Sequence, residues 1–167
     1  MSRIQLTNNF YLDEFTRSDV AARHGIVIDV QINDAVYLNL LRLCINVLQP
    51  LREALGPVHI LSGVRPVQLN TLIGGSKTSQ HISGCAADIV VTGHTPLEVA
   101  RWIYYSCLYD QVIHEFGQWT HVSTSAAVVF DRAQPLTAIK QPRLLRKPKT
   151  VYVPGLLSME DALRMIA

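Results

Sequence analysis

The chain has 167 residues, of which 49% are hydrophobic and 17% are charged. This length and composition fit one compact domain and exclude a disordered or fibrous protein. The 15 Lys and Arg residues against 13 Asp and Glu residues give a net charge of only +2. A DNA-packing protein needs a large basic excess to neutralise phosphates, so we expect no nucleic-acid partner.

The three cysteines, Cys44, Cys85 and Cys107, are widely spaced and include no C-x-x-C pair. An odd number with this spacing argues against both a disulfide framework and a thiolate zinc knuckle. We expect reduced thiols in apolar surroundings, including Cys85, although it lies between His81 and Asp88 in the sequence.

The first residues, MSRIQLTNNFYLDEF, lack the apolar stretch of a secretory signal. No later run reaches the roughly 18–20 apolar residues that a membrane span requires. The sequence therefore predicts a protein that is synthesised in the cytoplasm without a signal peptide and has no membrane span.

Helical patterns dominate the first third of the chain. Leu12 and Phe15, and then the stretch that follows Ser18, indicate one or two short helical turns. A longer apolar repeat predicts a helix over residues 34–55, with Asn33 as its cap and Gly56 as its stop. Pro50 lies inside this segment and should bend or break the helix.

The middle of the chain alternates short elements with ordered loops. A strand is expected at 58–61, and the turn after it presents Arg65 ahead of a short helix that ends near Leu72. The stretch GGSKTSQHISG is too rich in Gly and Ser for a regular element. Residues 86–91 then form an apolar strand that carries one acid, Asp88, in its middle.

Thr95, Pro96 and Glu98 provide the start signals of a helix that should run to about Leu108. The later elements are expected to be strands, followed by one short helix from Met159 with Ser158 as its cap. These strands are placed at 111–116 and 120–123, which form a hairpin around Gly117, and at 137–140 and 151–153. Early helices and late strands favour an α+β fold with a mostly antiparallel sheet.

The strongest chemical signal is the set His81, Asp88 and His121. Two imidazoles and one carboxylate form a three-ligand zinc set that leaves a fourth position for water, as catalytic sites do. Gly84 would allow a sharp turn between His81 and Asp88. A carboxylate within an apolar strand also requires a compensating cation, because its burial costs several kcal/mol.

Glu115 is the best candidate for the base that takes a proton from the bound water. A three-residue hairpin loop of 117–119 would place Glu115 directly opposite His121 on the same face of the sheet. A two-residue loop would pair Glu115 with Thr120 and turn it away from the metal. That register would favour His114 instead.

Arg65 and Ser79 are candidates for binding the substrate, and Arg65 is also a candidate catalytic residue. The guanidinium of Arg65 offers a planar pair of donors for a carboxylate or a polarised carbonyl of a peptide. Ser79 lies two residues before His81 and could donate a hydrogen bond to the substrate or to a metal ligand. The other interpretation of Arg65 is a structural arginine that caps turn carbonyls.

Three segments together resemble the M15 zinc peptidases, specifically the group near the zinc D-alanyl-D-alanine carboxypeptidases of bacteria and bacteriophages. They are S-G-V-R-P, then G-G-S-K-T-S-Q-H-I-S-G-C-A-A-D-I, and D-Q-V-I-H-E-F-G-Q-W-T-H-V-S. The opening F-Y-L-D-E-F-T-R-S-D-V-A-A-R-H-G is similar to the start of that group. The resemblance extends from about Phe10 to Ser123, and its S-x-H-x-x-G-x-A-x-D and W-x-H parts are specific in this order.

The resemblance implies the fold shared with hedgehog signalling domains, with zinc held by His81, Asp88 and His121. It also implies cleavage of bacterial cell-wall stem peptides, by a carboxypeptidase or by a murein endopeptidase. Two positions depart from the family pattern. Many members have the catalytic acid where this chain has Gln118, and an aromatic residue usually stands at the position of Val64.

The remaining charged residues give weaker signals. The basic cluster of Lys140, Arg143, Arg146, Lys147 and Lys149 is either a solvated face or a surface that docks on an anionic wall polymer. Three further histidines, at positions 24, 59 and 94, have no partner in the motif and are expected at the surface or in packing roles.

The sequence as a whole predicts a single zinc peptidase domain over 1–167, with its motif core at about 58–123. We expect a monomer that acts on peptidoglycan as a phage or prophage lysin, reaching the wall after release or as part of a phage particle. The alternative is a non-catalytic wall-binding or virion structural module that retains the fold.

Overall fold

The computed structural model describes residues 3–126, 131–144 and 146–166, without the side chains of 146 and 147. Within these ranges no helix has the length and apolar character needed to cross a membrane. The elements are β1 (Gln5–Thr7), β2 (Phe10–Tyr11), α1 (Leu12–Phe15), α2 (Asp19–Arg23), α3 (Ala35–Leu43), η1 (Cys44–Leu48), α4 (Gln49–Leu55), β3 (Val58–Ser62), α5 (Val67–Leu72), β4 (Ala86–Val91), α6 (Pro96–Ser106), β5 (Gln111–Glu115), β6 (Trp119–Ser123), β7 (Gln134–Arg143), β8 (Arg146–Pro154) and α7 (Met159–Arg164).

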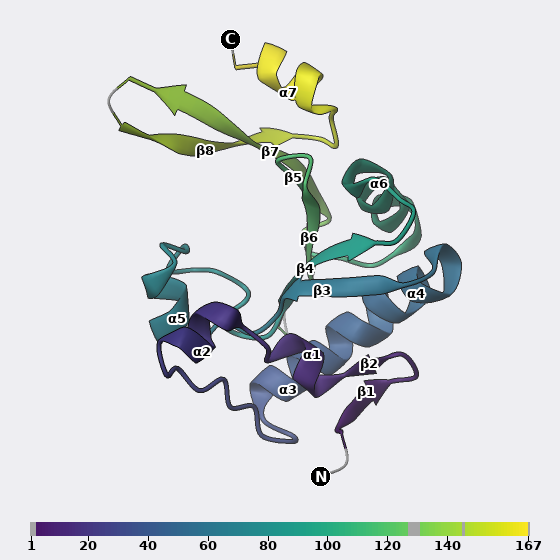
Figure 1. The fold of residues 1–167 in the computed structure, drawn as a ribbon. Coiled ribbons are helices and arrows are strands. Elements are labelled where there is room, and N and C mark those ends of the chain that lie inside the picture. The colour runs from purple at the N-terminus through teal and green to yellow at the C-terminus, as the bar shows by residue number, and fades with distance from the viewer. Residues whose placement is uncertain (1–2, 127–130, 145, 167) are drawn as a thin grey trace.

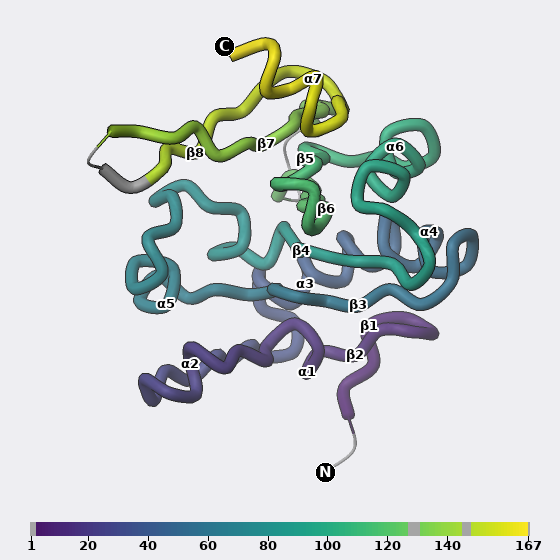
Figure 2. Tube along the Cα trace, turned by 45° about the horizontal axis from the view of Figure 1, so that its top comes forward, coloured from purple at the N-terminus to yellow at the C-terminus, as the bar shows by residue number. Residues whose placement is uncertain are grey.

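A six-stranded sheet in the order β3-β4-β6-β5-β7-β8 organises the fold. All neighbouring strands are antiparallel except β5 and β7, which are parallel. The expected mixed fold with a mostly antiparallel sheet is therefore confirmed. Helices α4 and α6 lie on one side of the sheet, while α2, α5 and the β7–β8 hairpin extend toward the other side (Figures 1 and 2).

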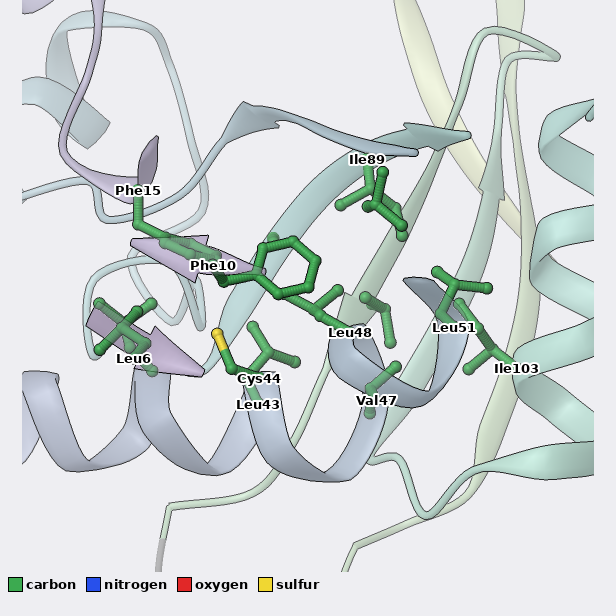
Figure 3. Packing of buried hydrophobic residues seen from close by; sticks show 14 of the residues in the cluster. Leu6, Phe10, Phe15, Leu43, Cys44, Val47, Leu48, Leu51, Ile89 and Ile103 are labelled. Atoms are coloured by element: carbon green, nitrogen blue, oxygen red, sulfur yellow. The ribbon is translucent and has the colours of Figure 1, made fainter. Parts of the chain in front are cut away.

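The main hydrophobic core fills the space between the sheet and the helices. Phe10 and Phe15 from the N-terminal elements pack over the long helix, and Ile89 of β4 and Ile103 of α6 complete the cluster (Figure 3). All four side chains are buried. Because β4 and β6 pack against this core on one face, their alternate side chains are free to point toward the opposite face.

The long helix runs over residues 35–55, and its cap is Asp34 rather than Asn33. Asp34 Oδ1 accepts from Tyr37 N at 2.7 Å, whereas Asn33 adopts a left-handed φ of 68° that turns the chain into the helix. The helix ends at Gly56, as expected. Pro50 does not break it, because the π-helical turn η1 just before it accommodates the missing N–H and the ring.

Strands β7 and β8 are much longer than the short strands expected at 137–140 and 151–153. Pairing of β7 with β5 ends at Ala138, and the hairpin continues as a two-stranded arm beyond that point. The full length of these strands was not recognised from the sequence, because they contain prolines and many basic residues. Both features disfavour sheet interiors. The small hairpin of β1 and β2 was not anticipated either.

The other expected elements are present. Ser18, Thr95 and Ser158 cap α2, α6 and α7 as expected, and Thr95 forms the capping box with Glu98. Helix α6 ends at Ser106, slightly before the expected end. The three cysteines are free thiols, and burial raises the pKa of Cys44 and of Cys85.

Candidate metal centre and active site

Asp88 and His121 are brought together by strand pairing. Asp88 of β4 lies directly opposite His121 of β6 in the antiparallel register, so both side chains leave the same face of the sheet. The His121 Nδ1 atom lies 2.8 Å from Asp88 Oδ1. The neighbours Ala87 and Val122 point the other way, into the core.

His81 reaches the same point from the loop before β4. Gly84 lets this loop turn with a φ of +72°, and a Cβ atom there would lie 2.7 Å from the carbonyl oxygen of Val36. The Nδ1 atom of His81 lies 2.7 Å from the Gly63 carbonyl oxygen. If Nδ1 carries the proton and donates it there, Nε2 is left as the acceptor that faces Asp88 and His121.

Two of the three distances between the candidate ligand atoms match those around a small tetrahedral cation, and the third, 2.8 Å between His121 Nδ1 and Asp88 Oδ1, is shorter. His81 Nε2 lies 3.3 Å from both His121 Nδ1 and Asp88 Oδ1. Zinc bonds of about 2.0–2.1 Å in tetrahedral geometry place ligand atoms about 3.3 Å apart. The donor set is thus arranged to hold a divalent metal, and a tetrahedral ion bound there would keep a fourth position for a small ligand.

The protonation behaviour of these groups suits metal binding. Burial lowers the pKa of His81, which keeps its imidazole neutral, although Asp88 opposes this effect. Burial disfavours ionisation of Asp88, but its contacts with the His121 and His81 imidazoles overcome this effect and hold the pKa of the carboxyl far below its usual range. A neutral imidazole and an ionised carboxylate are the forms that bind a metal.

Glu115 shares the face of His121, but not in the expected pairing. The hairpin loop consists of residues 116–118, so Glu115 lies opposite Trp119, and His121 lies opposite Ile113. Because the loop still has three residues, Glu115 lies on the expected face of the sheet, the face that carries His121. Only the pairing of the two strands differs from the expectation. Burial raises the pKa of Glu115, and the nearby His121 only partly offsets this effect.

His114 faces the opposite side of the sheet from the metal ligands. It is paired with Thr120, and its Nδ1 atom lies 2.9 Å from the carbonyl oxygen of Leu157. The alternative register that would have made His114 the base is therefore wrong. His24, His59 and His94 do not line the cleft, and Gln118 is exposed at the hairpin turn.

Arg65 lies beside the candidate metal site. Its guanidinium Nη2 is 3.8 Å from Asp88 Oδ2, and its backbone N–H donates to the His81 carbonyl oxygen. The Nε atom is buried and has no hydrogen-bond partner within the described part of the chain. Burial lowers the pKa of Arg65, and Asp88 partly offsets this effect. The guanidinium is therefore placed to bind a further anion or a carbonyl oxygen.

These side chains line one cleft of about 750 Å³. Its walls include the three candidate ligands together with Arg65, Ser79 and Glu115. The β7–β8 arm closes one side of the cleft with Lys140, Thr150 and Tyr152. Tyr152 pairs with Ala138, which in turn pairs with Glu115, so all three share one row of the sheet.

Neither Tyr152 nor Lys140 was identified as a cleft residue from the sequence. Their placement depends on the parallel pairing of β5 with β7, which no local pattern indicates. Lys140 contacts the Phe116 ring at 4.3 Å and donates to Thr150 Oγ1 at 2.8 Å. Of the basic cluster, Arg143 and Lys149 are also exposed on the arm, while the side chains of Arg146 and Lys147 lie outside the described residues.

A network around the buried carboxylate of Asp110 holds the loop that carries His81. Asp110 accepts hydrogen bonds from Gln80 Nε2 at 2.8 Å and from the Arg132 backbone N–H at 2.9 Å. The Arg132 guanidinium pairs with the same carboxylate. Burial opposes ionisation of Asp110, but these partners lower its pKa. No sequence pattern indicates this network, because its members are distant along the chain.

Comparison with known proteins identifies the family. A family model described as Peptidase M15 matches residues 8–123, a range that contains all three candidate ligands, Glu115 and Arg65. A search of curated proteins finds no match.

Proposed function

This chain belongs to the M15 peptidase family, and we propose from that premise that it is a zinc peptidase acting on peptidoglycan stem peptides. The observation that carries the proposal is the convergence of three ligand atoms in a cleft that also contains a carboxylate and a guanidinium. An amide hydrolase of this kind needs all of these groups on one surface.

His81, Asp88 and His121 would hold the zinc ion, which when bound supplies Lewis acidity and lowers the pKa of a coordinated water. Glu115 would accept a proton from that water and return it to the leaving amine. Its raised pKa suits both directions of transfer, because the protonated and ionised forms lie closer in free energy.

Arg65 would hold a carboxylate or carbonyl oxygen of the peptide through its planar donors. Arg65 lines the cleft and keeps 20% of its side chain exposed, which supports this role. Ser79 lines the same cleft and would donate a hydrogen bond to the substrate. The backbone N–H of Arg65 donates to the His81 carbonyl oxygen, which holds the turn after β3 beside the loop before β4.

We also propose that the whole chain forms one peptidase domain with the fold of hedgehog signalling domains. Strand β7 pairs with β5, and Tyr152 of β8 lines the cleft, so the segment beyond the family match completes the same sheet and site. The motif resemblance supports a monomeric lysin of phage or prophage origin that acts on the wall after release or within a phage particle.

The test is to incubate the purified protein with soluble muropeptides, with and without a chelator, and to identify the products by mass spectrometry. We expect cleavage that the chelator abolishes and that added zinc restores. The mass of the released fragment distinguishes a carboxypeptidase from an endopeptidase. Tight binding to murein without any product would contradict the proposal and favour a non-catalytic wall-binding module.

A further inference from the structure

The cleft that contains the candidate metal site adjoins a second hollow at Arg65. This hollow, of about 370 Å³, lies between α2, β3 and α5. Arg65 and Ile73 line both the hollow and the metal cleft, so the two spaces share a wall. In Figures 1 and 2, α2 and α5 lie on the side of the molecule away from α6 and α4. The surface around the metal site is therefore hollowed on both sides of Arg65.

Positive charge surrounds the second hollow, which we call the arginine pocket. Its lining includes Arg17, Arg23 and Arg65, against a single acid, Asp19. Arg23 Nε donates to the backbone oxygen of Asp19 at 3.2 Å, which leaves the charge uncompensated. Within the described residues, Arg17 and Arg23 form no ion pair with any carboxylate. Two exposed guanidinium groups are therefore available to an incoming anion.

The floor of the arginine pocket is apolar. Val64 and Leu69 are buried beneath it, while Leu61 is 53% exposed and Ile73 is 43% exposed. An apolar floor below a cationic rim fits a ligand that carries a carboxylate on a short aliphatic frame. Peptide residues with a free carboxylate beside methyl or methylene groups have this chemistry. Val64, which departs from the family pattern, forms part of this floor.

We propose that the arginine pocket is a second substrate subsite, which binds an internal carboxylate of the stem peptide. The proposal rests on the proposed function and makes it more specific. A peptide anchored there and in the main cleft would pass Arg65, which lines both spaces.

The test measures binding in the metal-free protein, so that no cleavage occurs. The probes are two synthetic stem peptides, L-alanyl-γ-D-glutamyl-L-lysyl-D-alanyl-D-alanine and its counterpart in which the internal D-glutamate carboxylate is an amide. Calorimetry should show that the carboxylate peptide binds the wild-type chain about tenfold more tightly than the amide. In the Arg17→Gln/Arg23→Gln variant, this difference should fall to about twofold or less.

The matched control is Arg52→Gln/Arg164→Gln, which removes the same charge away from both hollows and should keep the tenfold preference. A preference that survives in the Arg17→Gln/Arg23→Gln variant would overturn the proposal. A third peptide, amidated only at its C-terminus, provides a second check. If the loss of affinity in the variant follows the terminal carboxylate instead, the pocket does not bind the internal carboxylate and the proposal is wrong. None of these outcomes depends on whether the zinc-loaded protein cleaves muropeptides.

Discussion

Asp88 shows how one residue can reveal a site before the fold is known. An acid within an apolar strand needs a compensating cation, and the structure places two imidazoles and the Arg65 guanidinium around it. The cluster of these three candidate ligands was therefore predictable from residue type and order. The pairing of Glu115 was not, because it depends on where a three-residue loop begins, which neither Gly117 nor its neighbours determine.

The role of Glu115 is tested by removing its charge. Glu115→Gln retains the shape of the side chain but cannot accept a proton, so kcat for muropeptide cleavage should fall at least about a hundredfold. Zinc content, measured by elemental analysis, should remain at the wild-type level because the three ligands are intact.

Gln118→Ala provides the control, since Gln118 is exposed in the hairpin turn, outside the lining of the cleft. We expect this variant to retain wild-type kcat. Full activity in Glu115→Gln would assign the proton transfer to another group.

At the scale of elements, local patterns determined most of the fold. The caps of α2, α6 and α7 and the bounds of β4 follow from short-range chemistry, and all are present. The arm of β7 and β8 and the parallel pairing of β5 with β7 arise from contacts between distant segments. Such contacts leave no periodic pattern in the local sequence. The length of these strands was therefore underestimated, and the cleft residues on them were missed.

The loop between His81 and Asp88 depends on a glycine at position 84. Gly84→Ala should lower the free energy of unfolding by about 3 kcal/mol, because a left-handed φ and a close contact with the Val36 carbonyl add together. Urea denaturation measures this change. Zinc affinity should fall as well, since the loop carries His81.

Gly93→Ala is the matched comparison, because Gly93 has a φ of +82° but a Cβ atom added there would have nothing within 4 Å. This substitution should cost only about 1 kcal/mol and leave zinc affinity unchanged. Equal losses in the two variants would show that the contact with Val36 does not constrain the loop.

At the scale of the whole molecule, Asp110 links the loop before β4 to the start of β5 and to Arg132 near β7. Its side chain is only 4% exposed and accepts several hydrogen bonds. We therefore expect Asp110→Asn to lower the free energy of unfolding by about 2 kcal/mol at pH 7, measured by urea denaturation.

The pH dependence of this effect has a definite sign. The folded-state pKa of Asp110 is lowered, so its contribution is complete above the ordinary aspartate pKa and is lost as pH falls through the folded-state value. The difference in the free energy of unfolding between wild type and Asp110→Asn should therefore become smaller below about pH 4. Asp29→Asn, at an exposed site, should change the free energy of unfolding at pH 7 by less than about 0.5 kcal/mol. If the free energies of unfolding of wild type and Asp110→Asn differed by the same amount from pH 7 to pH 3, this linkage would be contradicted.

The proposed activity depends on the convergence of His81, Asp88 and His121 on one divalent ion. The most direct measurement is anomalous diffraction at the zinc edge from crystals of the zinc-loaded protein, with Asp88→Ala prepared in parallel. We predict one zinc ion bound by these three side chains, with its fourth position open to solvent, and no zinc in Asp88→Ala. Zinc bound elsewhere, or a fourth position filled by a protein atom, would contradict the proposed metal centre.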